Sequence, residues 1–473
     1  MKNCENTAQN AVSNEALSGL ETNKKVGFTG KIGFVLAASG SAVGLGNLWR
    51  FPYLAAHYGG GIFVFCYVLL ALFFGLTLLM LEISIGRNTG KSVIGAFSTL
   101  NKKFKWFGYV CVIVPLIIVP YYCVIGGWVV KYAWSFLVGS EGLVGVENAE
   151  ATGAFFGSFI SSTWEPMIFF LIFAFVTIAI VAFGVQKGIE KMSKILMPAL
   201  AIMAVALMIY VLCQPGALEG LGYTLIPDFE NFSFKTVLGA LGQLFYSLSI
   251  GMCIMITYGS YMKKDVKITS SSAQIAIFDS LFALIASLII IPAVFAFGNP
   301  DDAFAKAGPS LMFVQMTNVF NAFPAGGRII AFIFFVLVFF AAVTSSVSLV
   351  ESIVAVLCED GKMKRVTACV IVFGAILVLG TLSSLGYGVL SGVRIGGLDI
   401  LDTFDFLANN ILMPIVAIVT CVFAGWFIEK SILPKEIGIE NNKWLNTYFN
   451  VIVKYVAPIC ILAILLTGLF IKI

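Results

Sequence analysis

The amino-acid sequence predicts an all-α polytopic membrane protein with eleven transmembrane helices. Of its 473 residues, 59% are hydrophobic and only 11% are charged, whereas about a quarter of the residues of soluble proteins are charged. The mean hydropathy is +0.98, and apolar runs of about twenty residues, the length that crosses a bilayer, recur along the chain. This composition excludes a soluble domain. The net charge of +4 is small and scattered, so a nucleic-acid partner is not expected.

Each expected span is an apolar run bounded by charged residues or by Gly and Pro. In chain order, the eleven spans cover residues 31–56, 61–87, 106–138, 166–184, 190–213, 236–262, 274–298, 326–358, 366–386, 399–428 and 448–471. The third and the eighth are long enough to tilt or to protrude into water. The ten cysteines include no CxxC pair, so we interpret them as small apolar residues and not as metal ligands or disulfides.

The basic residues predict how the chain lies in the membrane. Most of the 29 Lys and Arg residues fall in the polar stretch 1–30 and in every second loop after it, while acids gather in the loops between. Short cytoplasmic loops hold the excess of Lys and Arg, so we expect a multi-pass protein of the cell membrane with a cytoplasmic N-terminal tail (1–30) and an external carboxyl end. Residues 214–235 would form an extracellular connection, and residues 429–473 a cytoplasmic loop and the eleventh span.

Two of the expected spans contain stretches that disfavour a continuous helix. The first span carries SGSAVGLGNLWRFP, in which glycines alternate with polar residues, and the sixth carries QLFYSLSIGMC over residues 243–253. Unpaired backbone cannot face lipid, so an unwound stretch at this depth would have to line a polar cavity. Close packing through small residues would also explain the glycines, but it does not explain Asn47 and Arg50 within one helical turn of each other.

The two interrupted spans each open one of two similar halves. Spans one to five cover residues 31–213 and spans six to ten cover residues 236–428, two nearly equal lengths. This arrangement predicts two inverted five-helix repeats, followed by one extra helix, with a substrate site where the two helices are interrupted.

The eighth span carries AAVTSS, residues 341–346. On a helix, two of its hydroxyls and one main-chain carbonyl can point to the same place, and oxygen ligands of this kind suit a hard cation such as sodium. The alternative is that the hydroxyls bond back to the preceding turn, as Ser and Thr commonly do in membrane helices. The cation interpretation needs further free carbonyls, which the first span offers at Gly40 and Val43.

Charged residues inside a membrane are costly unless they are paired or functional. Glu82, Asp279 and Glu351 lie well inside expected spans, and Arg50 and Asp405 lie near the outer parts of theirs. For Glu82 we favour a structural role, accepting hydrogen bonds from unwound backbone, over ion binding. Asp279 has the better claim to function, because its span contains no basic residue. Glu351 could do either.

At these residues the chain resembles the neurotransmitter:sodium symporter family, in its bacterial amino-acid transporter branch. The resemblance covers nearly the whole chain and rests on GSAVGLGNLWRFPY (40–53), GGG (59–61), Glu82 with GR (86–87), GIEKMSKILMP (188–198), QLFYSLSIGM (243–252), TYGSY (257–261), AAVTSS (341–346) and DTFDF (402–406). It implies the leucine-transporter-type fold, with two inverted five-helix repeats plus one extra helix. Transporters of this family are themselves an example from which the inverted-repeat rule was drawn, so the rule is not independent support here.

The resemblance implies two sodium sites. The first would consist of the Ala42 carbonyl, Asn47, Ser247 and Asp279, completed by the carboxylate of the substrate itself. The second would consist of the carbonyls of Gly40, Val43 and Ala341 and the hydroxyls of Thr344 and Ser345. Because the substrate completes the first site, the affinities for sodium and substrate would be linked.

The resemblance also implies how an amino acid would bind. Its carboxylate would meet the N–H groups of Leu45 and Gly46, at the positive end of a half-helix, and the hydroxyl of Tyr122. Carbonyls near Ala42, Tyr246 and Ser249 would take its amino group. The implied pocket for the side chain is lined by Ser41, Ile118, Tyr122, Tyr246, Ser249, Met252, Ser345 and Leu349.

Three further features would open and close the transport path. Arg50 and Asp405 would pair through water as an outer gate, with Tyr246 as an aromatic lid, although a static surface pair is the alternative. Lys25 and Phe28 stand where the family usually has Arg and Trp, so an inner gate from Lys25 to Glu359 or Asp360 would lack the bidentate pairing of arginine. Gly188 and Pro198 resemble the point at which span five unwinds in the family.

Two departures from the family bear on what is carried. Asp279 stands where Asn is common, and a fixed carboxylate there can offset the sodium charge that chloride offsets in animal members, so we infer independence of chloride. Met252 replaces an aromatic ring found in some relatives, and the flexible side chain of methionine favours aromatic or large aliphatic substrates.

The sequence therefore predicts a sodium-coupled symporter that imports a hydrophobic or aromatic L-amino acid by alternating access. The alternatives are a sodium-independent or proton-coupled carrier of the same fold superfamily, or a channel. An enzyme is not expected, because the single histidine, His57, has no HExxH or CxxC cluster beside it. The expected partners are sodium ions, the amino acid and the bilayer, with no obligatory protein partner, because the chain lacks a twelfth span that some relatives use in packing contacts.

Overall fold

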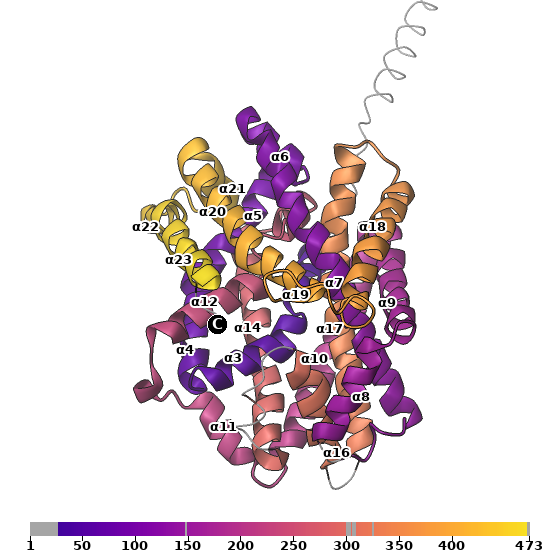
Figure 1. The fold of residues 1–473 in the computed structure, drawn as a ribbon. Helices are drawn as coiled ribbons and strands as arrows, with labels where there is room; N and C mark the ends of the chain where they lie inside the picture. The colour runs from indigo at the N-terminus through magenta and orange to yellow at the C-terminus, as the bar shows by residue number, and fades with distance from the viewer. Residues whose placement is uncertain (1–26, 147–148, 299–303, 305–308, 324–325, 471–473) are drawn as a thin grey trace, which may run out of the picture.

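The computed structural model describes residues 27–146, 149–298, 304, 309–323 and 326–470, and helices make up its regular structure (Figure 1). Within these ranges, nine helices are long and apolar enough to cross a membrane. In chain order they are α4 (Gly61–Leu70) with the π-helical η2 (Ala71–Gly75) and α5 (Leu76–Thr89); η3 (Lys102–Phe104) with α7 (Lys105–Val138); α9 (Glu165–Ala182); η4 (Val185–Glu190) with α10 (Lys191–Leu212); α14 (Ile268–Phe297); α17 (Gly327–Glu359); α18 (Arg365–Leu385); α19 (Ile400–Asp405) with η7 (Phe406–Leu412), α20 (Met413–Val422) and η8 (Phe423–Phe427); and α22 (Lys443–Val451) with η9 (Ile452–Val456) and α23 (Ala457–Phe470).

Two further parts of the chain consist of helices separated by a break. The first consists of α2 (Lys31–Ala42), the π-helical η1 (Gly46–Arg50) and α3 (Phe51–His57), and it bends by 53° at the break. The other consists of α12 (Phe234–Ser247) and α13 (Ile254–Ser260), separated by residues 248–253. With the first counted as one span, length and composition support up to ten spans in the described residues, so the expected count of eleven, which includes α12 and α13 together, stays a prediction.

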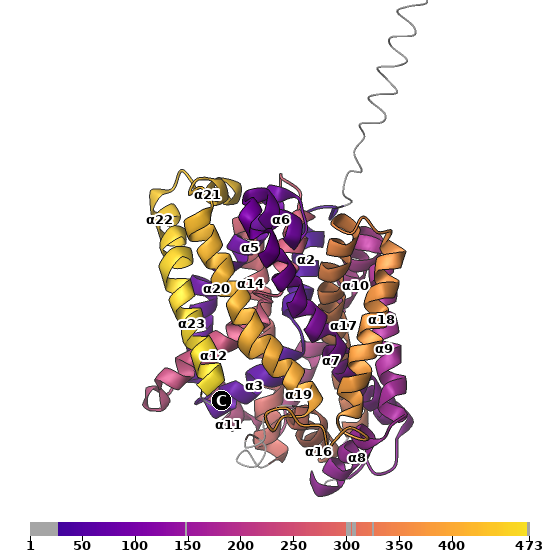
Figure 2. The same ribbon diagram turned by 45° about the horizontal axis from the view of Figure 1, so that its top comes forward.

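Short helices cover the two ends of the bundle. α6 (Val93–Leu100) and α21 (Ile432–Ile437) lie at one end, which we call the α21 end, at the top of Figure 2. α8 (Ala149–Ser161), α11 (Ala217–Leu225) and α16 (Met316–Asn321) lie at the opposite end, the α11 end. The remaining short elements are η5 (Phe229–Asn231) and η6 (Leu311–Gln315).

The expected span boundaries are close to those of the structure with three exceptions. The spans expected at 190–213, 274–298 and 448–471 begin five or six residues earlier, at Val185, Ile268 and Lys443. Their first turns, VQKGIE, ITSSSA and KWLNT, are polar or mixed, so an apolar run starts later than the helix that carries it. These three helices therefore begin before the spans that the apolar runs predict.

The interior of the bundle holds the interrupted spans. α17 packs along α7 and also contacts α2 and α10, while α14 contacts α2 and α3. The middle of the first span is therefore surrounded by uninterrupted helices that shield its unwound backbone from lipid, as a polar break inside a bilayer requires.

Candidate functional site

At the first break, backbone N–H groups lose their partners within the helix. Two of them donate hydrogen bonds to side-chain oxygens instead. α2 ends at Ala42, and Val43 has extended backbone angles. The N–H of Gly44 donates to Asn47 Oδ1 at 3.2 Å, and the N–H of Leu45 donates to the Tyr122 hydroxyl at 3.3 Å. The start of the following half-helix thus presents the N–H of Leu45 toward α7.

Close approach explains two of the glycines in this break. A Cβ atom at Gly46 would lie 2.4 Å from the ring of Tyr246, and one at Gly44 would lie 2.6 Å from Ser345 Oγ. Both distances are too short for any side chain. Glycine here lets spans six and eight reach the unwound backbone.

The second break lies against the first. Ser249 and Gly251 have positive φ angles of 55° and 77°, and the N–H of Gly251 donates to Glu82 Oε1 at 2.8 Å. Ser249 Oγ donates to the carbonyl of Ser41 at 3.2 Å and lies 3.3 Å from Ser41 Oγ. Glu82 therefore lies where the predicted structural role requires it, and the two breaks are joined directly.

A buried carboxylate lies beside the two breaks. Asp279 is fully buried, and its Oδ1 accepts from Ser247 Oγ at 2.6 Å and from Asn47 Nδ2 at 2.8 Å. Its Oδ2 accepts from the hydroxyl of Tyr67 at 2.6 Å, a residue that the sequence analysis missed. Asn47 presents its nitrogen to the carboxylate, so its amide would have to turn over for Oδ1 to coordinate a cation.

The oxygen atoms of the expected second sodium site fall into two groups. Ser345 Oγ lies 3.3 Å from the carbonyl oxygen of Gly40 and 3.5 Å from that of Val43. Thr344 Oγ1 lies 2.9 Å from the carbonyl oxygen of Ala341 and 3.1 Å from that of Phe340, and it donates to these carbonyls of the preceding turn. Ser345 thus reaches the first span, whereas Thr344 makes the back-bond that the sequence analysis left open. The two groups are adjacent, because a Cβ at Gly40 would lie 3.1 Å from Thr344 Cβ.

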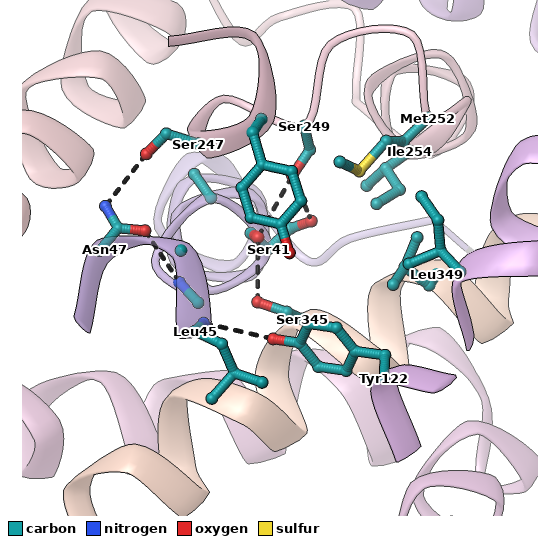
Figure 3. A pocket seen from close by; sticks show the side chains of 15 residues that line it. Ser41, Leu45, Asn47, Tyr122, Ser247, Ser249, Met252, Ile254, Ser345 and Leu349 are labelled. Atoms are coloured by element: carbon teal, nitrogen blue, oxygen red, sulfur yellow. Dashed lines mark hydrogen bonds between the residues drawn. The ribbon is translucent and has the colours of Figure 1, made fainter. Parts of the chain in front are cut away.

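A single cavity lies between the breaks, α7 and α17 (Figure 3). All twelve predicted substrate residues line it, namely Ser41, Ala42, Leu45, Gly46, Ile118, Tyr122, Tyr246, Ser247, Ser249, Met252, Ser345 and Leu349. Gly44, Asn47 and Ile254 also line it; Asn47 was expected only as a sodium ligand, and the other two were missed. An isoleucine in an apolar run carries no signal of such a position.

The cavity has a polar side and an apolar side. Figure 3 shows Asn47 and Ser247 on one side and the side chains of Met252, Ile254 and Leu349 together on the other. The hydroxyl of Tyr122 and the N–H of Leu45 lie between them. Such a cavity suits a small amphipathic ligand.

The described residues of the expected gates make the following contacts. The guanidinium carbon of Arg50 lies 5.3 Å from the centre of the Tyr246 ring, while Asp405 Oδ1 accepts from Asn409 at 2.7 Å. Between these two described residues, Arg50 and Asp405, no ion pair within 4.0 Å is formed, and their role as an outer gate stays a prediction. Glu359 accepts from the backbone N–H of Ser92 at 2.7 Å.

The α21 end of the first span is closed by other contacts. Lys25 lies outside the described residues, so the predicted inner gate is not visible. Phe28 is buried against Phe34, Tyr258 and Tyr261, and Glu190 accepts from the N–H of Thr29 at 2.9 Å.

Two other expectations concern charge and unwinding. Glu351 is fully buried and forms an ion pair with Arg365 and a hydrogen bond of 2.7 Å with Tyr261, an arrangement typical of a structural pair. The backbone from Gly188 to Pro198 is helical throughout, in η4 and α10. Span five is therefore wound in this structure.

The known proteins to which this chain is similar include proteins named sodium-dependent transporters. Residues 25–140 and 158–472 match the family described as the sodium:neurotransmitter symporter family. The chain is 36% identical over 454 residues to an uncharacterized sodium-dependent transporter of Bacillus subtilis, YhdH, a match that covers 94% of this chain and 98% of that protein. It is 29% identical to another, MJ1319 of Methanocaldococcus jannaschii, over 92% of this chain and 89% of that one.

A solved structure extends the similarity to the fold. The crystal structure of MhsT in complex with L-phenylalanine has a TM-score of 0.84, at 36% identity, and the match covers 94% of this chain and all of that one. The leucine-transporter-type fold and the absence of an enzymatic function expected from the sequence are thereby confirmed. The chain is a multi-pass membrane protein and a sodium-dependent symporter that belongs to the sodium:neurotransmitter symporter family.

Proposed function

We propose that the chain imports a hydrophobic or aromatic L-amino acid together with sodium, by alternating access and without chloride. The observation that carries this proposal is the cavity between the two breaks, which has Asn47 and Ser247 on one side and apolar side chains on the other. The N–H of Leu45 lies between the two sides, and the buried carboxylate of Asp279 lies behind Asn47 and Ser247.

The chemistry of the cavity fits each part of such a substrate. The carboxylate of an amino acid would accept from the N–H groups of Leu45 and Gly46 at the start of a half-helix and from Tyr122. Carbonyls near Ala42, Tyr246 and Ser249 would take the ammonium group. Met252 and Leu349 would contact a large apolar side chain, and MhsT, whose structure holds L-phenylalanine, is the similar protein that supports this substrate class.

We propose two sodium ions, one at each of the two sites expected from the sequence. The first would lie at Asp279 and Asn47 beside the carboxylate of the substrate, and the second between Ser345 and the carbonyls of the first span. Oxygen donors of this kind suit a hard cation. Loss of the second ion toward the cytoplasm would favour the inward-facing form and release the substrate. We place the amino terminus and the α21 end in the cytoplasm, because the basic loops lie there.

Independence of chloride is proposed from the fixed charge of Asp279. In proteoliposomes, uptake should be equal in chloride and in gluconate. D279N removes the charge, so we expect sodium affinity to fall at least about tenfold and chloride to restore part of the uptake. The exposed loop variant D265N is the matched control. A wild-type protein that loses uptake in gluconate would contradict the proposal.

Coupling is tested by uptake of labelled phenylalanine and leucine into proteoliposomes with an inward sodium gradient. We expect accumulation above the external concentration, abolished when potassium replaces sodium. The alternative, a sodium-independent or proton-coupled carrier, would accumulate the amino acid under a proton gradient with sodium absent. Equilibration without accumulation would indicate a channel.

A further inference from the structure

A lysine on the last span faces outward with no acidic partner. Lys454 lies in the middle of η9 and is partly exposed. Among the described residues, no carboxylate lies within 4.0 Å of its Nζ atom, and Nζ donates no hydrogen bond. The acid that follows η8, Glu429, accepts instead from Ser431 Oγ at 2.7 Å. A lipid-facing charge without a partner is costly, which makes it a candidate for binding.

Two aromatic rings hold the ammonium group in place. Lys454 Nζ lies 4.0 Å from the centre of the Trp426 ring and 5.5 Å from that of Tyr455. The rings are 57% and 49% exposed, respectively, so neither is part of the protein interior. A cation against an open aromatic face is fixed in position while its N–H groups stay available.

The backbone at this point departs from the α-helix on both sides of the contact. Trp426 lies in η8 and Lys454 in η9, and both segments are π-helical and contact each other. Gly425 makes the contact close, because a Cβ there would lie 3.0 Å from the Cα of Lys454. π-Helical turns are rare and are frequent at functional sites.

The depth of Lys454 places its ammonium group at the membrane surface. Polar residues, Asn446, Thr447 and Asn450, precede Lys454, and a mainly apolar run follows it. Lys454 therefore lies near the edge of the hydrocarbon layer, from which a lysine side chain reaches the headgroups. Trp426 is one residue from the end of its span, where tryptophan normally marks the interface.

An apolar strip continues from this point along α23. Ile459, Leu462 and Leu466 follow Tyr455 at intervals of four, three and four residues, which places them on one helix face. They are 67%, 46% and 46% exposed. Lys430, just beyond η8, is exposed as well, so a basic and aromatic rim lies directly above an open apolar strip.

We propose that Lys454, Trp426 and Tyr455 bind the headgroup of an anionic phospholipid in the leaflet at the α21 end. The lipid phosphate accepts from Lys454, and an acyl chain lies along the strip of α23. The charge of the rim favours an anionic lipid over a zwitterionic one. Each lysine near an anionic surface contributes about 1 kcal/mol, which corresponds to about fivefold in affinity.

The test is a titration of the purified full-length protein in detergent with phosphatidylglycerol or phosphatidylcholine, with bound lipid counted by native mass spectrometry. We expect the wild type to bind one phosphatidylglycerol at least about fivefold more tightly than K454Q does, and K454R to bind like the wild type. K187Q, which changes another exposed lysine on a π-helical turn, is the matched control and should also bind like the wild type.

Equal binding of phosphatidylglycerol by the wild type and K454Q, or equal binding of the two lipids by the wild type, would overturn the proposal. So would equally tight binding of glycerol phosphate, because the acyl chains would then contribute nothing. If K454Q does not fold, the salt dependence of lipid binding by the wild type tests the proposal. Its preference for phosphatidylglycerol should weaken as choline chloride screens the charge. A preference that the salt does not change would contradict the proposed site.

Discussion

At the scale of single residues, Asp279 draws its hydrogen-bond donors from three different spans. Asn47 belongs to the first, Tyr67 to the second and Ser247 to the sixth, and all three donors lie within 2.8 Å of a carboxylate oxygen. Charge-assisted hydrogen bonds of this length are strong and fix the orientation of the acceptor. Tyr67 holds the oxygen that faces away from Asn47, so it orients the carboxylate without touching a ligand.

The role of Tyr67 predicts a change in sodium affinity. Y67F removes the donor to Asp279 Oδ2, and a hydrogen bond to a charged group is worth about 1.5–3 kcal/mol. We therefore expect the sodium concentration for half-maximal amino-acid binding to rise about tenfold or more. Y132F is the matched control, because the buried Tyr132 hydroxyl has no described partner and its loss should change little. Equal sodium affinity in both variants would remove Tyr67 from the site.

Individual residues could be predicted where their chemistry is unusual for a membrane. Asp279 stood out as a carboxylate in an apolar run, and Ser345 as part of a hydroxyl cluster. Tyr67 and Ile254 did not, because both types are common in spans and their function depends on what packs opposite them. Which of two adjacent hydroxyls reaches across to the first span also depends on helix rotation, which the sequence does not encode locally.

At the scale of elements, the second break depends on one glycine. Gly251 has a positive φ, its N–H binds Glu82, and a Cβ there would lie 2.8 Å from the carbonyl oxygen of Met413. G251A therefore combines backbone strain with a clash against main chain that cannot move freely.

We expect G251A to lower the melting temperature of the purified protein and to abolish amino-acid binding. G242A is the matched control: in α12, a Cβ at Gly242 would meet nothing within 4 Å, and alanine there should stabilise the helix by up to about 1 kcal/mol. Thermal unfolding in detergent and a binding assay measure both variants. A functional G251A protein would show that the break tolerates other backbone conformations.

The connection that contains α21 is held by an ionic cluster outside the spans. Glu436 forms an ion pair of 2.6 Å with Arg87 at the end of α5 and one of 2.8 Å with Lys264, which follows α13. Burial raises the pKa of the Glu436 carboxyl, but the hydrogen bonds and charges of Lys264 and Arg87 outweigh it, so the pKa ends below its ordinary value.

The lowered pKa of Glu436 predicts a pH dependence of stability. A carboxyl whose pKa is lower in the folded protein stabilises it above the ordinary pKa, and this contribution is lost as the pH falls through the lowered value. We expect E436Q to be less stable than the wild type by about 1 kcal/mol at pH 7 and the difference to vanish in acid. E440Q, an exposed acid in the same loop, is the control. Unfolding curves between pH 7 and pH 3 would contradict the idea if the difference persisted.

The spans could be predicted from the length of their apolar runs, and the two breaks from the Gly and Ser residues in them. The breaks at residues 43–45 and 248–253 fall inside the stretches that the glycines and serines mark. The starts of the helices at Val185, Ile268 and Lys443 were not predictable in this way, because a helix can extend past the apolar layer in polar residues.

At the scale of the whole molecule, one group of contacts joins what would be two ligand sites. Ser41 and Ser249 connect the breaks, Ser345 connects the first break to α17, and Ser247 connects the second break to Asp279. A ligand bound at one of these contacts would lie within a few hydrogen bonds of the others. Linkage between sodium and amino acid therefore needs no distant pathway.

Linkage predicts that the two affinities change by the same factor. If sodium raises the affinity for the amino acid tenfold, the amino acid must raise the affinity for sodium tenfold. T344A removes a hydroxyl of the proposed second sodium site that does not line the cavity. We therefore expect amino-acid binding to weaken about tenfold at low sodium and to recover at saturating sodium. T420A is the matched control, since the buried Thr420 hydroxyl has no described partner. Equilibrium binding of labelled amino acid across a series of sodium concentrations measures this. A loss of binding that saturating sodium does not restore would place Thr344 in the substrate site. If, in the wild type, sodium and the amino acid changed each other's affinity by unequal factors, the two ligands would not share one equilibrium.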